Sequence, residues 1–218
     1  MITGLKVAVV VDNPSWILPH AERLVELARE RGATATLARA YEEVSGGDVA
    51  FLLGCTAIAP ASARARSRIN LVVHESSLPQ GRGFAPVAWQ VLEGRTRIPV
   101  VLFEAADELD AGPIYLRDEI RLTGYELNDD IRRLQGEATV TLCMRFLEQY
   151  PNVAPQPQIG QATAYKRRTP DDSRLDPDRS LREQFNLLRV VDNERYPAFF
   201  DVDGHRYILK ILPGLKQP

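Results

Sequence analysis

The feature that most constrains the fold is an unbroken apolar run near the start of the chain. An amphipathic segment and further apolar runs follow it. Residues 5–12 read LKVAVVVD, which is typical of a β-strand buried on both faces. Residues 19–32 predict a helix, because one apolar stripe runs between Pro19 in the first turn and Gly32 at the end. Strand, helix and strand in this order favour parallel pairing with right-handed crossovers.

Five further apolar runs predict the remaining strands of the sheet. They cover residues 34–39, 49–54, 69–74, 98–105 and 112–122. A long helix is expected over residues 127–150, opened by Asn128 or a neighbouring acid as its N-cap. Its apolar face comprises Ile131, Leu134, Ala138, Leu142 and Phe146. We therefore predict an α/β fold with an open, mostly parallel twisted sheet.

The character of the chain changes after Tyr150. Residues 151–180 are polar, charged and rich in proline, as expected of a surface connection. A short helix is predicted over residues 181–192, and a hairpin over 198–211, where alternating residues flank an Asp-Gly pair. We expect a main domain over residues 1–155 and a small C-terminal subdomain, a helix plus a hairpin, over residues 156–218.

The composition is that of a soluble protein without a nucleic-acid or membrane partner. The 218 residues carry a net charge of -2, which supplies no basic field for tRNA or DNA. Cys55 and Cys143 fit reduced thiols better than a disulfide framework. The start of the chain predicts no leader, and no run approaches the roughly 18–20 apolar residues of a membrane span. We expect a cytoplasmic protein.

His74 ends the predicted strand 69–74. Alternate side chains of a strand share a face, so Asn70, Val72 and His74 point the same way. The carboxyl edge of an open parallel sheet is where ligand crevices form. The alternative is a histidine satisfied by a backbone carbonyl. The stretch SSLPQGRG that follows favours a site, because its glycines beside Arg82 allow the backbone to approach a ligand.

Asp110, in a turn ahead of the sixth strand, is the second candidate. Alone, it fits a turn aspartate that caps its own backbone. Beside His74, its carboxylate would orient the imidazole for proton transfer near neutral pH. The chain has no G-x-S-x-G elbow and no glycine-rich phosphate loop after its first strand, and its three histidines lack metal-ligand spacing. We predict acid–base chemistry and no metal.

The run HESSLPQGRGFAPVAW and the later LDAGPIY together resemble the signature of the formyltransferases that use 10-formyltetrahydrofolate. GCTAI resembles that family's folate-contacting loop, while RRTPDDSRLD and LLRVVDNERYPAFF resemble the tails of members that formylate amino sugars. The chain looks most similar to the nucleotide-sugar N-formyltransferases of surface-glycan, pseudaminic-acid-type pathways. The resemblance implies a Rossmann-like formyltransferase fold with residues 1–155 as the catalytic domain, 10-formyltetrahydrofolate as the cofactor, and a homodimer.

The resemblance also implies catalytic roles. His74 matches the family's histidine, and Asp110 matches the aspartate that orients it and helps to remove the proton of the acceptor amine. The amine attacks the formyl carbon, and the resulting oxyanion needs hydrogen-bond donors. The family's asparagine, two residues before the histidine, is Val72 here. Asn70 lies on the same face, about 7 Å further along the strand, and is one candidate substitute; a backbone N–H or a water is another.

Contacts to the cofactor and the acceptor are carried over from the family by position. The cofactor contacts so implied are Gly54, Cys55, Thr56, Ala57, Ile58, Glu104, Ala105 and Leu109. The acceptor contacts so implied are Asn13, Trp16, Ser76, Arg82 and Gly83. Trp16 has simple packing as its alternative. The basic run 166–168 is either a diphosphate contact or a solvated charged surface.

The resemblance thus predicts transfer of a formyl group to the amine of a nucleotide-linked amino sugar, for example a UDP-4-amino-4,6-dideoxy sugar. Methionyl-tRNA and glycinamide ribonucleotide are alternative acceptors. The net charge and the short tail argue against tRNA, and the extended tail and the first turn, DNPSW, argue against the ribonucleotide. A third alternative is a non-catalytic folate or nucleotide-sugar binding protein, in which Val72 marks a lost activity.

Overall fold

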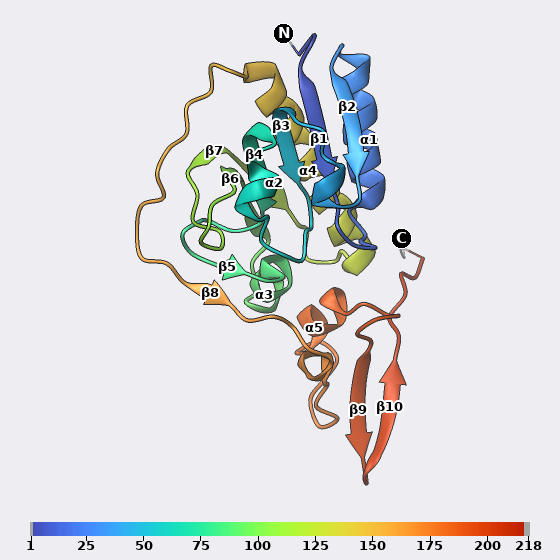
Figure 1. Ribbon diagram of the computed structural model, residues 1–218. Coiled ribbons are helices and arrows are strands. Elements are labelled where there is room, and N and C mark those ends of the chain that lie inside the picture. Colours follow the sequence, from blue (N-terminus) through green and yellow to red (C-terminus); the bar gives the residue numbers. More distant parts are fainter. Residues whose placement is uncertain (1, 216–218) are drawn as a thin grey trace.

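The computed structural model describes residues 2–215; Met1 and 216–218, at the outer ends of the two predicted domains, lie outside the described residues. Within this range, strands form one sheet in the order β2-β1-β3-β4-β6-β7 (Figure 1). These strands are β1 (Lys6–Val10), β2 (Thr34–Ala38), β3 (Gly47–Leu52), β4 (Ser67–His74), β6 (Arg97–Glu104) and β7 (Ile114–Arg121). Each lies within about two residues of its predicted position.

The sheet is mostly parallel, as predicted. Pairing from β2 through β1 and β3 to β4 is parallel, whereas β6 is antiparallel to both β4 and β7. β6 and β7 are joined by residues 105–113, which contain no helix, and such a short connection suits antiparallel neighbours. This loop brings Asp110 back toward the end of β4.

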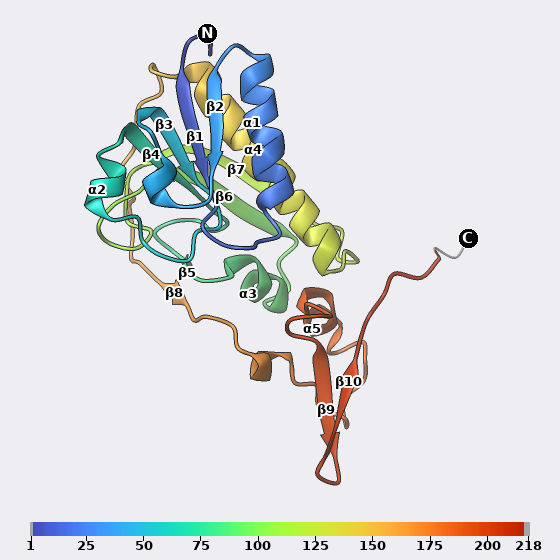
Figure 2. The same cartoon turned by 45° about the vertical axis from the view of Figure 1, so that its right-hand side comes forward.

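Two long helices, α1 (Leu18–Glu30) and α4 (Asn128–Gln149), cover one face of the sheet (Figures 1 and 2). Strand residues such as Val9 and Phe51 point toward these helices and belong to the largest apolar cluster. No helix in residues 2–215 is both long and apolar enough to cross a membrane.

The opposite face of the sheet is more thinly covered. Its strand residues include Ala8, Val10 and Leu52, which pack with Tyr41 from a 3-10 turn and Cys55 from a loop rather than with a long helix. Short elements that the sequence did not predict supply the rest of the structure around the sheet. They are the helices α2 (Ala61–Arg64) and α3 (Pro86–Leu92), the strand β5 (Arg82–Gly83), and the 3-10 turns Tyr41–Glu43 and Pro170–Ser173.

α4 has the predicted apolar face but not the predicted cap. Ile131, Leu142 and Phe146 are buried, and Leu134 and Ala138 pack against the same cluster. The N-cap position is Leu127, and no side chain within the described chain caps it, so the expected cap at Asn128 or a neighbouring acid is wrong. The nearest acid, Glu126, instead binds the preceding turn.

The chain after Tyr150 runs along the outside of the main body and ends in a small separate cluster (Figure 2). β8 (Ala164–Tyr165) pairs with β5, and α5 (Phe185–Val190) precedes the hairpin of β9 (Ala198–Val202) and β10 (His205–Leu209). The predicted hairpin is confirmed. The tail helix is present but shorter than the predicted range of 181–192, with the residues before Phe185 in turns.

A buried ion pair attaches this tail to the main body. Arg189, 2% exposed, donates from Nε to the Glu126 carbonyl at 3.0 Å, and its Nη2 lies 3.2 Å from the Glu126 carboxylate. Burial alone would raise the pKa of Glu126. Hydrogen bonds from the backbone and hydroxyl of Thr123 and from the backbone of Gly124 outweigh it and lower the pKa to about 2.

We predict that Glu126→Gln destabilises the protein by about 2 kcal/mol at pH 7, because Arg189 loses its buried counter-ion. A carboxyl whose pKa is lowered on folding stabilises the fold above its unfolded pKa, and this stabilisation is lost as the pH falls toward about 2. Urea unfolding measured from pH 7 to pH 2 should therefore show that, below about pH 4.5, the free energy of unfolding changes less with pH in the variant than in the wild-type protein. Glu148→Gln, at an exposed site of α4, is the control; equal stability of the two variants would contradict the prediction.

Candidate functional site

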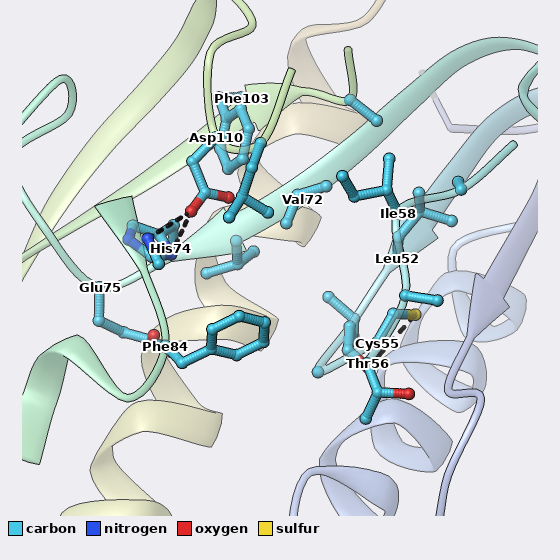
Figure 3. A pocket seen from close by; sticks show the side chains of 18 of the residues that line it. Leu52, Cys55, Thr56, Ile58, Val72, His74, Glu75, Phe84, Phe103 and Asp110 are labelled. Carbon is cyan, nitrogen blue, oxygen red and sulfur yellow. Dashed lines mark hydrogen bonds and ion pairs between the residues drawn. The ribbon is translucent and has the colours of Figure 1, made fainter. Parts of the chain in front are cut away.

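A cavity of about 580 Å³ lies at the carboxyl ends of β3 and β4. This volume is in the range of sites for small organic ligands. Figure 3 shows His74 and Asp110 on one side, facing the loop that holds Cys55 and Thr56, with Val72 between them. Most of the wall comes from the ends of strands and the chain next to them, in residues 52–59, 72–75, 83–86, 103, 105–106 and 108–110.

The structure brings His74 and Asp110 together in this wall. Nδ1 of His74 lies 3.9 Å from Oδ2 of Asp110, and the side chains are 8% and 9% exposed. Nε2 of His74 lies 2.8 Å from the carbonyl oxygen of Gly81. Because this carbonyl can only accept, Nε2 carries a hydrogen, and Nδ1 has a free lone pair in the neutral ring. The pair can therefore take up a proton at Nδ1 and hold its charge beside a carboxylate.

Asp110 is held in the left-handed backbone region, with φ of 52°. Its Oδ2 accepts a hydrogen bond from the backbone N–H of Gly83 at 2.9 Å. The amide of Gln158 donates to the carbonyls of Asp110 and Gly112, both at 2.8 Å. Residues from two separate segments thus fix Asp110, since Gly83 binds its carboxylate and Gln158 binds its backbone.

Two glycines allow the chain to pass this closely. A Cβ at Gly112 would lie 1.8 Å from the carbonyl oxygen of Glu104, so only glycine fits where the loop crosses the end of β6. Gly83 has φ of +97°, and a Cβ there would lie 2.6 Å from the carbonyl oxygen of Tyr165. The predicted close approach of the backbone near Arg82 is therefore present, although the nearest atoms belong to the protein itself.

Asp12, at the end of β1, holds the loop on the opposite side of the cavity. Its carboxylate accepts the backbone N–H of Thr56 at 3.1 Å, and Asn13 donates from Nδ2 to the carbonyl of Gly54 at 2.8 Å. Burial raises the pKa of the Cys55 thiol, so this cysteine stays neutral and is a poor nucleophile. This side of the cavity supplies shape and backbone groups rather than a reactive side chain.

Arg64 joins the two loops that flank this side. It donates to the carbonyls of Ala59 at 2.8 Å and Ala106 at 3.3 Å, and its other nitrogen contacts the carboxylate of Asp107. Residues 54–60 and 105–109 are therefore braced against each other.

Most of the residues expected from the sequence lie in the cavity wall. They are His74, Asp110, Gly54, Cys55, Thr56, Ala57, Ile58, Ala105, Leu109, Trp16 and Gly83. Asn70, Glu104, Asn13, Ser76 and Arg82 are not among the described residues that line it.

All of this second set except Ser76 interact with other groups of the protein. The amide of Asn70 donates to the carbonyl of Arg64 at 2.8 Å, and the carboxylate of Glu104 accepts the hydroxyl of Tyr115 at 3.0 Å. Arg82 pairs with Glu108 at 2.5 Å. Ser76 is 2% exposed, and its hydroxyl has no hydrogen-bond partner among residues 2–215.

Sequence reasoning missed several residues of the wall. They are Tyr41, Glu75, Phe84, Gln135 and Thr139. The signal available for α4 was the pair Gln135 and Thr139, polar residues four apart that share one side of a helix. Glu75 was passed over because the strand pattern ends at His74.

The fold has relatives of known structure. Methionyl-tRNA formyltransferase from Clostridium thermocellum matches with a TM-score of 0.81 and 20% identity over 95% of this chain and 92% of that one. A sugar N-formyltransferase from Shewanella sp. FDAARGOS_354 matches with a TM-score of 0.72 and 14% identity over 98% of this chain and 99% of that one. HypX from Aquifex aeolicus, solved in complex with tetrahydrofolic acid, matches with a TM-score of 0.76 and 16% identity over 96% of this chain and 38% of that one. At these identities the likeness shows a shared fold.

The sequence match defines the family. The formyl transferase family model covers residues 4–142, and the chain belongs to this family of formyl-transferring enzymes, which use 10-formyltetrahydrofolate. Methionyl-tRNA formyltransferase from Deinococcus radiodurans is 29% identical over 115 residues, which are 52% of this chain and 36% of that protein. The chain thus spans less than two fifths of the length of the curated relatives it matches.

We predict that Asp110→Asn lowers the rate of formyl transfer about a hundredfold or more. The amide oxygen can still accept from Gly83, but the charge that faces His74 is lost. Steady-state kinetics should show the loss mainly in kcat, with Asp178→Asn, an exposed aspartate of the connection after Tyr150, close to the wild-type rate. A variant that retains full kcat would exclude Asp110 from the chemistry.

Proposed function

We propose that this protein transfers the formyl group of 10-formyltetrahydrofolate to the amine of a nucleotide-linked amino sugar, in the cytoplasm and for surface-glycan synthesis. The observation that carries the proposal is the His74–Asp110 pair in the wall of a cavity large enough for small ligands, in a chain of the formyl transferase family. In this proposal residues 1–155 are the catalytic domain and residues 156–218 the C-terminal subdomain.

The cavity suits a flat, partly polar ring system such as a pterin. Leu52, Ile58, Val72 and Phe103 give it apolar walls, and the loop 54–58 and residues 105–109 border it with backbone groups. These two loops are the segments we propose to hold the cofactor. When bound, the cofactor supplies the activated formyl group.

The chain's own part in the reaction is proton transfer and orientation. His74 keeps its ring fixed by the hydrogen bond from Nε2 to the Gly81 carbonyl, so Nδ1 accepts a proton from the acceptor nitrogen. Asp110 stabilises the charged ring that results. The apolar side chains around the pair exclude water and strengthen this attraction.

Arg167 supports an anionic acceptor such as a nucleoside diphosphate sugar. It lines the cavity, and its guanidinium lies 4.2 Å from the centre of the Phe84 ring. Its neighbours are occupied, since Lys166 pairs with Asp172 at 2.6 Å and Arg168 donates to the Val190 carbonyl at 2.9 Å. Stacking orients a guanidinium while leaving its N–H groups available for a phosphate.

Methionyl-tRNA is the main rival acceptor, because relatives and solved structures with that name match as well as those of sugar enzymes do. The net charge of -2 favours the smaller acceptor, since tRNA binding depends on neutralising many phosphates.

The test offers both acceptors to the protein in parallel. Purified protein with 10-formyltetrahydrofolate and UDP- or dTDP-linked amino sugars should release tetrahydrofolate and yield a formamide detectable by mass spectrometry. Turnover with methionyl-tRNA alone would replace the proposed acceptor. Tight nucleotide-sugar binding without turnover of any acceptor would indicate a binding protein.

We predict that Arg167→Ala raises KM for the nucleotide sugar about tenfold, with kcat and the KM for the folate donor little changed. Arg68→Ala removes the same charge at an exposed position near the start of β4 and is the control. An unchanged KM for the sugar, or a rise confined to the folate donor, would contradict a phosphate contact.

We also propose a homodimer, in which the C-terminal hairpin buries its exposed apolar residues. Tyr207 and Ile208 are 52% and 56% exposed on β10. Ile208→Glu should then shift the protein from dimer to monomer in sedimentation velocity, because the charge would be buried at the interface. A wild-type protein that sediments as a monomer at all concentrations would contradict this proposal.

A further inference from the structure

Glu75 places a carboxyl group in the cavity wall, and the proposed reaction assigns no role to this group. It directly follows His74, at the first position beyond β4 (Figure 3). The groups near it are the His74 ring, the Asp110 carboxylate and, from α4, the side chain of Gln135, which lines the same cavity. Within residues 2–215, no lysine or arginine forms an ion pair with it.

The backbone of Glu75 is fixed from α3. Gln90 of α3, 2% exposed, donates from Nε2 to the backbone carbonyl of Glu75 at 2.6 Å. Gln135 and Thr139 of α4 line the same cavity, and the hydroxyl of Thr139 donates to the Gln135 carbonyl at 2.9 Å. The chain at Glu75 is therefore held in a fixed place from which its carboxyl group lines the cavity.

The electrostatics of this end of the cavity call for a cation. Burial raises the pKa of the Glu75 carboxyl and outweighs the opposite effect of the adjacent His74 ring, which means that the charged form of the carboxyl is poorly solvated. A half-buried carboxylate without a lysine or arginine partner is costly, and an alkylammonium group would supply both a positive charge and hydrogen-bond donors.

We propose that Glu75 binds the ammonium group of the acceptor and takes its first proton. The inference rests on the proposed function, because it assumes that the acceptor is a primary amine. The carboxylate receives one proton from R–NH3+, which leaves a neutral carboxyl group and R–NH2 with a lone pair for attack. The nitrogen loses a second proton to Nδ1 of His74 as the C–N bond forms.

The protons balance over one turnover. His74 passes its proton to the nitrogen of the donor whose bond to the formyl carbon breaks, and Glu75 releases its proton to water. Two neighbouring residues thus divide the two deprotonations that an alkylammonium acceptor requires. Glu75 also makes the site selective for amines, because a hydroxyl group at the same position brings no positive charge.

The experiment compares two nucleotide sugars that differ only in carrying an amino or a hydroxyl group at the acceptor position. Calorimetry should give wild-type protein a dissociation constant about tenfold to a hundredfold lower for the amino sugar. Glu75→Gln, which keeps the size of the side chain and removes its charge, should bind both sugars equally and lose most of its kcat/KM. Glu137→Gln, an exposed glutamate of α4, is the matched control.

Each outcome decides the matter. A Glu75→Gln protein that keeps the wild-type preference for the amino sugar overturns the inference, even if its activity is low. Glu75→Asp keeps the charge on a shorter side chain and should show an intermediate preference, which provides a second measurement if the first variant folds poorly. Wild-type protein that formylates no amino sugar overturns the proposed function and this inference with it, whereas turnover without the preference overturns the inference alone.

Discussion

The hydrogen bonds that hold Asp110 in the left-handed backbone region are the constraint on which the site depends. A non-glycine residue with φ of 52° carries a cost of about 1–2 kcal/mol, and it persists only where its surroundings fix it. Here the Gly83 N–H and the Gln158 amide do so, each bond contributing roughly 1 kcal/mol. Gln158 belongs to the connection after Tyr150. The chain beyond the main sheet therefore takes part in positioning the carboxylate that faces His74.

Much of the fold could be predicted from the sequence because its strands and long helices are patterned strongly. The continuous run in β1 and the alternation around Asp203–Gly204 each admit one interpretation. The antiparallel pairing of β6 could not be predicted, since pairing direction depends on where the connections cross the sheet. α3 was not predicted, because the glycines and prolines of residues 79–86 indicate turns and the helix that follows has only seven residues.

Only the part of the candidate site that lies at strand ends could be predicted, because that prediction depends on the alternation of side chains along a strand. It places His74 at the end of β4, and the turn before β7 brings Asp110 to the same edge. Beyond a strand end the alternation no longer gives direction, so the pairing of Arg82 with Glu108 and the burial of Ser76 needed coordinates. The position of Glu75 could not be predicted for the same reason, because it lies one residue beyond the end of β4 and only the coordinates place it in the wall.

Val72 makes the middle of the cavity apolar at the position where the resembling family has an asparagine. The side chain of Asn70 does not reach the wall, since its amide donates to the Arg64 carbonyl, and the backbone carbonyl of Asn70 accepts from the Ala105 N–H at 2.8 Å. Turning the side chain inward would break the contact with Arg64, which braces the two loops around the cavity. The ionisable groups on the His74 side of the cavity are His74, Glu75 and Asp110 (Figure 3). An apolar centre lowers the local dielectric and strengthens charge interactions at this end. The proton transfers that we propose for this cavity therefore rely on these three side chains, since Val72 supplies no amide donor.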